Sequence, residues 1–137
     1  MIVQRFVKWC ETATTRERAE GVAMLGRALA EGEVTAADRP ATVAAMTLVL
    51  EDPSPKVRLA LAEALAASDN APATIIRALG ADNEEIGCLV AGVSPVLTDL
   101  DLIDLAASGG KRLQMAIAGR SAVSVRLAAA IAEIGGR

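Results

Sequence analysis

Short segments with helical hydrophobic periodicity follow one another along the whole chain. Near the start, the apolar residues Val3, Phe6 and Val7 fall on one side of a helical projection, and charged or amide residues fall on the other. A later segment places apolar residues at positions i, i+3, i+4 and i+7, namely Pro72, Ile75, Ile76 and Leu79. This spacing predicts an all-α protein.

Capping signals divide these segments into separate helices. Thr14 with Glu17, and Asp82 with Glu85, have the spacing of a capping box, and Thr98 is a third candidate cap. Further boundaries are indicated at Gly32, Pro40, Pro53, Pro95, Gly109 and Ser121 or Ser124. We therefore expect a short α-solenoid of seven to eight antiparallel helices, since brief turns leave neighbouring helices no other arrangement.

An internal similarity supports this arrangement. Residues 57–65 read VRLALAEAL and residues 125–131 read VRLAAAI, and apolar starts at Ile86 and Leu113 divide the interval between them into steps of similar length. A helix pair that cannot bury its apolar face alone and stacks on copies of itself forms an α-solenoid.

Residues 52–58, DPSPKVR, followed by the apolar run 60–65, resemble the signature of a HEAT repeat. More narrowly, residues 94–103 (SPVLTDLDLI), 114–120 (QMAIAGR) and 2–6 (IVQRF) resemble an uncharacterised alphaproteobacterial family with HEAT-like repeats. The resemblance implies that Asp52, Arg58 and Arg126 bond between successive turns and helices. It also implies a single HEAT-like domain over residues 1–137, the N-terminal part of a longer protein.

Composition excludes several kinds of catalytic site. The 137 residues include no His, two Cys, one Trp, one Phe and no Tyr. Without His there is no Ser-His-Asp or Cys-His machinery and no His metal ligand. We expect no catalytic residues, no metal and no cofactor. Cys10 and Cys88 are expected to be reduced core thiols, because no export signal or membrane span is seen and a cytoplasmic location follows.

Three other groups of residues have structural interpretations. Asp99, Asp101 and Asp104 form an acidic group, of which Asp99 and Asp101 fall in the first turn of a predicted helix, where carboxylates interact favourably with the helix dipole. Phe6 and Trp9 share an apolar face and are expected to pack in the core. Four glycines have the paired spacing of a phosphate-binding loop but lack its Lys, and we expect them to let neighbouring helices approach closely: Gly21, Gly26, Gly87 and Gly92.

Charge varies along the chain although the net charge is only −3. Residues 51–105 hold three basic and ten acidic side chains, whereas residues 106–137 hold five basic and one acidic. Lys111, Arg112, Arg120 and Arg126 lie on adjacent predicted helices. We expect these four to form a positive surface that binds a partner.

These observations predict a non-enzymatic protein–protein interaction or scaffold module that binds neither nucleic acid nor membrane. The alternative is a helical-repeat nucleic-acid-binding or base-modifying enzyme that uses Asp, Trp and Arg. The acidic composition of the chain argues against this alternative, because neutralisation of phosphates by basic side chains supplies most of the affinity of a protein for nucleic acid. A homodimer through the C-terminal helix is also expected, with Val123, Leu127, Ile131 and Ile134 forming an uncovered apolar face.

Overall fold

The computed structural model describes residues 2–136, and it is all-helical over that range. Its helices are α1 (Ile2–Thr12), α2 (Thr15–Ala30), α3 (Arg39–Val49), α4 (Pro55–Leu65), α5 (Ala73–Gly80), α6 (Glu84–Val93), α7 (Asp99–Ser108), α8 (Lys111–Ala118) and α9 (Val125–Gly135). The described part thus has nine helices, and the prediction of seven to eight was too low. Turns as short as Gly109–Gly110 are enough to separate two of them.

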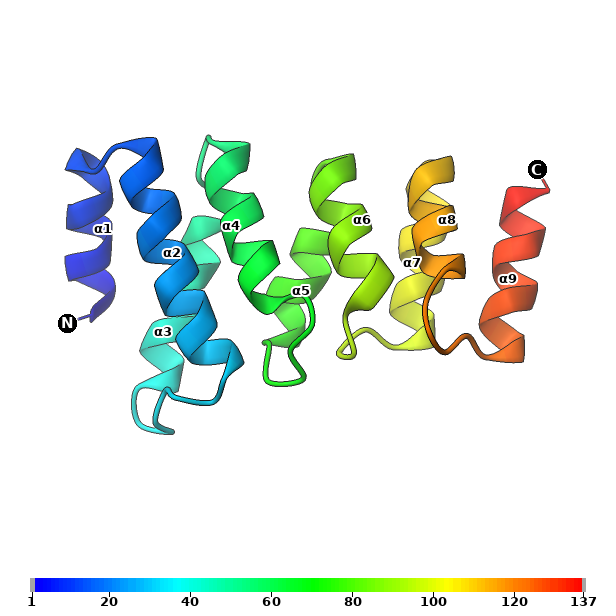
Figure 1. Cartoon of the computed structure of the whole chain (residues 1–137), viewed down its shortest axis with the longest axis horizontal. Helices are drawn as coiled ribbons and strands as arrows, with labels where there is room; N and C mark the ends of the chain where they lie inside the picture. Colours follow the sequence, from blue (N-terminus) through cyan, green and yellow to red (C-terminus); the bar gives the residue numbers. More distant parts are fainter. Residues whose placement is uncertain (1, 137) are drawn as a thin grey trace.

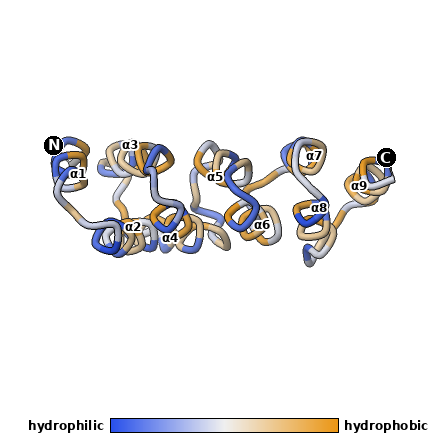
Figure 2. Tube along the Cα trace, turned by 90° about the horizontal axis from the view of Figure 1, so that it is seen from above, coloured by the Kyte–Doolittle hydropathy of each residue, from blue (hydrophilic) through white to orange (hydrophobic). Residues whose placement is uncertain are grey.

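The helices form an elongated array with the chain termini at opposite ends (Figure 1). Seen from above, α1, α3, α5 and α7 lie in one row and α2, α4, α6 and α8 lie in the other (Figure 2). Within the second row, α2 and α4 share the most extensive interface, whereas the contact between α4 and α6 is much smaller. Helix α9 closes the C-terminal end against α7 and α8.

Polar caps fix where several helices begin. The capping box predicted at Thr14 and Glu17 is present, with both reciprocal hydrogen bonds. Thr98 likewise caps α7, with Asp101 completing the box, and Ser124 rather than Ser121 caps α9. Each cap satisfies backbone amides that a helix start leaves without an intrahelical partner.

The capping box predicted at Asp82 and Glu85 is wrong. Asn83 is the residue before α6, and its side chain accepts a hydrogen bond from the amide of Ile86. Asp82 stands one residue earlier and binds an arginine of α4 instead. The side chains of Asp82 and Asn83 are both of a type that caps a helix. Because Asp82 forms an ion pair with Arg58 of α4, Asn83 is the residue that caps α6.

Helix α2 ends as the glycine at position 32 predicts. The amide of Glu33 donates to the carbonyl of Ala28, and the amide of Gly32 donates to the carbonyl of Leu29. This is a Schellman motif, and it needs the left-handed backbone of Gly32, whose φ is 73°. The motif turns the chain sharply and leaves Glu31 and Glu33 exposed at the end of the helix.

A single layer of apolar side chains lies between the two rows. Its largest fully buried members include Leu29, Met46, Leu61, Leu65, Ile75, Ile76, Leu79, Ile86, Leu102, Ile117 and Leu127. Three of them, Ile75, Ile76 and Leu79, belong to the stripe that the spacing of residues 72–79 predicts. The apolar layer runs the length of the array, because every helix contributes one stripe to it.

Missing side chains let neighbouring helices approach closely at three of the four predicted glycines. At Gly21 a Cβ would stand 2.6 Å from the ring of Trp9 on α1. A Cβ on Gly26 would stand 2.9 Å from the Cβ of Ala64, and one on Gly87 would stand 2.8 Å from the carbonyl oxygen of Gly80. Close helix approach is therefore confirmed at these three glycines. At Gly92 a Cβ would meet only ordinary contacts, the nearest at 3.6 Å. The expectation is wrong for Gly92.

Two expectations about burial need correction. Trp9 is 37% exposed and covers Gly21 from outside, so only Phe6 of the pair packs against the core. Both cysteines are free and only partly buried, and of the two Cys88 packs against the core as expected. Burial raises the pKa of the Cys10 thiol.

The C-terminal helix also faces the opposite way from the expectation. Leu127 is fully buried, and the other three residues of the predicted apolar face, Val123, Ile131 and Ile134, pack against the same core. The outward side of α9 carries Val125, which is 88% exposed, together with small residues. These apolar side chains face inward because α7 and α8 cover them. A homodimer through α9 stays a prediction, but it would use the Val125 side.

Within residues 2–136, no helix combines the length and the apolar character that crossing a membrane requires.

Candidate protein-binding surface

Two equivalent ion pairs link successive helices of the second row. Arg18, the fourth residue of α2, donates from Nε and Nη2 to the two carboxylate oxygens of Asp52, at 2.8 and 3.2 Å. Arg58, the fourth residue of α4, does the same to Asp82 at 2.8 and 3.2 Å. Each pair spans from one helix start to the loop before the next helix of the row.

Each arginine also binds the loop in front of its own helix. Arg18 donates from Nη1 to the carbonyl oxygen of Ala13 at 3.0 Å, and Arg58 donates to that of Asp52 at 2.7 Å. This pattern confirms the bonding between turns that the DPSPKVR motif implies. Because all four side chains are less than a fifth exposed, the bidentate pairs hold α2, α4 and the loop before α6 in register.

The series of arginines stops at α6. The fourth residue of α6 is Gly87, and the fourth residue of α8 is Gln114, whose side-chain amide donates to the carbonyl of Ala106 at 3.2 Å. Arg126 is the second residue of α9 and is exposed, with no ion pair or hydrogen bond to residues 2–136. It is therefore not the counterpart of Arg58 that the sequence similarity indicated.

The four cations predicted to bind a partner do not act alike. Arg120 points into the protein and donates to the carbonyl oxygens of Ala91 and Ser94, both at 2.7 Å. Arg112 forms an exposed pair with Glu84 at 2.9 Å. These two cations therefore already have partners within the chain.

The remaining two predicted cations stand closer to solvent. Lys111 lies 3.5 Å from the carbonyl oxygen of Gly135, and Arg126 is exposed on α9. That Lys111 and Arg126 belong to a partner-binding surface stays a prediction. Arg120, in contrast, binds backbone carbonyls inside the protein.

The acidic residues at the start of α7 have structural partners, as expected. Asp101 belongs to the capping box, and hydrogen bonds from Thr98 lower the pKa of its carboxyl. Asp99 accepts a hydrogen bond from Ser124 at 2.8 Å, which ties α7 to the start of α9. In the described chain, no three Cys, Asp or Glu residues converge in a way that would hold a metal ion.

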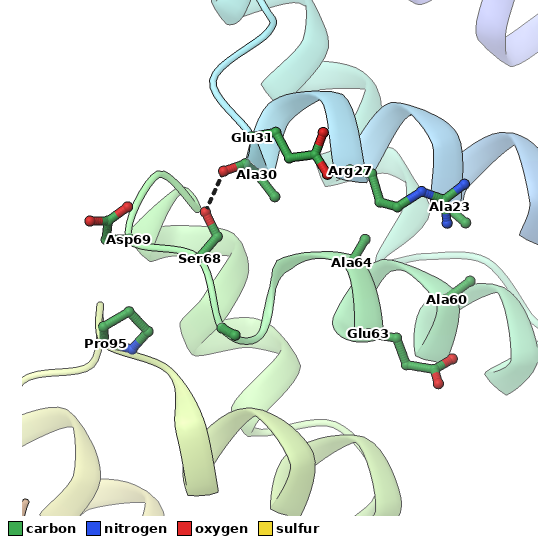
Figure 3. A pocket seen from close by; sticks show the side chains of 11 residues that line it. Ala23, Arg27, Ala30, Glu31, Ala60, Glu63, Ala64, Ser68, Asp69 and Pro95 are labelled. Atoms are coloured by element: carbon green, nitrogen blue, oxygen red, sulfur yellow. Dashed lines mark hydrogen bonds between the residues drawn. The ribbon is translucent and has the colours of Figure 1, made fainter. Parts of the chain in front are cut away.

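A hollow of the surface lies between α2 and α4. It has a volume of about 880 Å³ and opens to solvent, and we refer to it as the α2–α4 groove. Its lining consists of Ala23, Arg27, Ala30, Glu31, Ala60, Glu63, Ala64, Ala67, Ser68, Asp69 and Pro95. Figure 3 shows alanines of both helices along its floor, with Ser68, Asp69 and Pro95 together at one end.

Long-range hydrogen bonds fix one end of this groove. Ser68 donates from its hydroxyl to the carbonyl oxygen of Ala30 at 2.8 Å (Figure 3). The Asn70 side chain donates to the same oxygen at 3.2 Å. Arg39 donates to the carbonyl of Asn70 at 3.0 Å. The loops that follow α2 and α4 are thereby joined, so the groove is preformed.

Sequence reasoning missed the α2–α4 groove. A signal was available, since Ala23, Ala30, Ala60, Ala64 and Ala67 leave one face of each helix without a large side chain. Only the packing of α2 along α4, which Gly26 permits, shows that the two alanine faces meet.

Part of the chain is similar to a known family. Residues 88–137, from the middle of α6 onward, match the model of the family described as "uncharacterised protein conserved in bacteria" (DUF2336). This confirms the resemblance to an uncharacterised bacterial family for the C-terminal part of the chain. No curated protein and no solved structure shows significant similarity. Apart from Pro95, the α2–α4 groove lies outside the matched segment.

Proposed function

We propose that this protein is a non-enzymatic interaction module, built as a short HEAT-like α-solenoid, that binds a protein partner in the α2–α4 groove. The observation that carries the proposal is this preformed groove of about 880 Å³ between two helices of one row. A repeated Arg–Asp pair at equivalent helix positions supports the solenoid description. Solenoids offer partners an extended surface made of successive helices.

The residues that line the groove suit a helical partner. Its floor is made of alanines, so a partner backbone can come close to both helices, and polar groups border it. Because hydrogen bonds between the flanking loops hold it open, little ordering is needed on binding, and this favours affinity.

The alternative function, nucleic-acid binding or base modification, receives less support. Of the predicted cations, Arg120 is directed inward and Arg112 is paired with Glu84. Binding that rests on phosphate contacts weakens as salt rises, so a mobility-shift series in salt is the test for this alternative.

A substitution that fills the groove tests the proposed function. Ala67 is exposed and lines the groove, whereas Ala129 is exposed on α9, so Ala67→Trp and Ala129→Trp are matched variants. We expect proteins that co-purify with the wild type from native extract to be retained by Ala129→Trp and lost by Ala67→Trp. Circular dichroism checks that both variants are folded. Equal retention by the two variants contradicts the proposal.

A further inference from the structure

The charged residues around the α2–α4 groove show what kind of partner fits it. Glu31, Glu63 and Asp69 line the groove against a single cation, Arg27. None of the three carboxylates forms an ion pair with another residue in the range 2–136. The groove therefore presents negative charge that the described part of the chain does not neutralise.

The backbone adds to this charge at one end. Helices α2 and α4 run in the same direction, so their C-terminal ends lie side by side where Ser68 binds Ala30 (Figure 1). A helix C-terminus has the electrostatic effect of about half a negative charge. Glu31 follows the end of α2 directly, and Asp69 lies in the loop after α4, so two carboxylates add their charge to that of the helix ends.

A neighbouring carboxylate shows how crowded this end is. The Schellman motif after α2 brings Glu33 beside Glu31. The pKa of Glu33 is raised because its carboxyl shares a hydrogen bond with Glu31 and is repelled by the charge of Glu31. A cationic group from a partner would relieve this repulsion.

We infer, resting on the proposed function, that the α2–α4 groove takes a basic helix of a partner protein, with lysine or arginine side chains placed against Glu31 and Glu63. The partner helix presents small or apolar residues to the alanine floor and cations to the two rims. Complementary charge then selects the partner and orients it, since the more negative end of the groove takes the more basic end of the helix.

A defined peptide tests this inference without knowledge of the natural partner. The probe is a fluorescent alanine-rich helical peptide with lysines spaced to lie on its two flanks, and the matched peptide has glutamate at each lysine position. We expect the lysine peptide to bind the wild-type chain, with affinity falling as salt rises. We expect no binding of the glutamate peptide.

Two double variants with the same charge change separate the groove from general attraction. Glu31→Gln/Glu63→Gln removes the rim carboxylates, and Glu85→Gln/Asp104→Asn removes two exposed carboxylates elsewhere. We expect the first to weaken lysine-peptide binding about tenfold, as the loss of two exposed ion pairs implies. The second should weaken it less than about twofold. Amide shifts on peptide addition should be confined to α2, α4 and their loops.

Equal weakening by the two double variants, shifts spread over other helices, or no binding of the lysine peptide overturns the inference. The proposed function is decided separately, by Ala67→Trp. If that variant loses a natural partner while the lysine peptide does not bind, the groove is a binding site for a different kind of segment, and only the basic-helix inference fails.

Discussion

Arg58 binds both carboxylate oxygens of Asp82, a residue twenty-four positions further along the chain. The pair repeats the geometry of Arg18 and Asp52 one step earlier in the array. Since a bidentate arginine fixes both the distance and the orientation of its carboxylate, the pair sets how far α4 stands from the start of α6.

Removing one member of this pair should destabilise the protein. We expect Arg58→Gln to lower the free energy of unfolding by about 2 kcal/mol, because Asp82 is left partly buried without its cation. The control is Arg112→Gln, which breaks an exposed pair and should cost less than about 0.5 kcal/mol. Urea unfolding followed by circular dichroism measures both. Equal losses would mean that the partly buried pair has no special role.

The same pairs predict how stability depends on pH. Burial alone would raise the pKa values of Asp52 and Asp82, but hydrogen bonds from arginine and from backbone amides lower them below 3.8. A folded-state pKa below the unfolded one gives stabilisation that is fully present above about 3.8 and is lost as pH falls through the folded-state value. Unfolding free energy measured from pH 6 downward should therefore decline. In Asp52→Asn/Asp82→Asn the decline should be shallower.

Two glycines of α6 should respond oppositely to the same change. Gly87→Ala places a methyl group 2.8 Å from the backbone oxygen of Gly80, which cannot move freely, and we expect a loss of about 2 kcal/mol. Gly92→Ala meets only ordinary contacts and gains helix propensity, so we expect a stabilisation of about 0.5 kcal/mol. Thermal melts of the two variants give the comparison. A stable Gly87→Ala variant would show that α5 and α6 are not in close contact.

The cap of α7 offers a conservative test. Thr98→Ala removes the side-chain acceptor for the Asp101 amide and should cost about 1 kcal/mol. Thr98→Ser keeps a hydroxyl at the same place and should lower the free energy of unfolding by only about 0.3 kcal/mol. Denaturant midpoints measure the difference, and identical midpoints for the two variants would contradict the capping role.

Arg120 and Arg126 should differ although both were predicted to bind a partner. Arg120→Ala leaves the carbonyls of Ala91 and Ser94 without their donor, and we expect a loss of about 2 kcal/mol. Arg126→Ala alters an exposed side chain and should change stability by less than about 0.5 kcal/mol. Chemical denaturation of both variants checks the assignment. If Arg120→Ala leaves the free energy of unfolding unchanged, Arg120 is a free surface cation as the sequence predicted.

Features that depend on neighbouring residues could be predicted from the sequence. Thr14 and Thr98 cap helices where the pattern placed them, and Ser124 is one of the two caps that it offered for α9, because a cap involves residues only two or three positions away. The buried stripes follow helical spacing for the same reason. Gly32 ends α2 because few other residues adopt its backbone conformation.

Features that depend on distant residues could not be predicted in this way. Asp82 has the spacing of a cap but binds Arg58. Arg120 was expected on the surface as a free cation, but it donates hydrogen bonds to two backbone carbonyl oxygens. The α2–α4 groove exists only because Gly26 lets α2 lie against Ala64. Each outcome is decided by which helices become neighbours, and local periodicity does not contain that information.

The position of Trp9 over Gly21 has a practical consequence for spectroscopy. With one tryptophan and no tyrosine in the sequence, fluorescence excited in the near ultraviolet comes almost entirely from this side chain at the N-terminal end. Its emission therefore reports whether α1 remains on α2, while circular dichroism reports helices along the whole array. Coincident unfolding curves from the two signals would mean that the array melts as one cooperative unit, and separated curves would locate the first helix to detach.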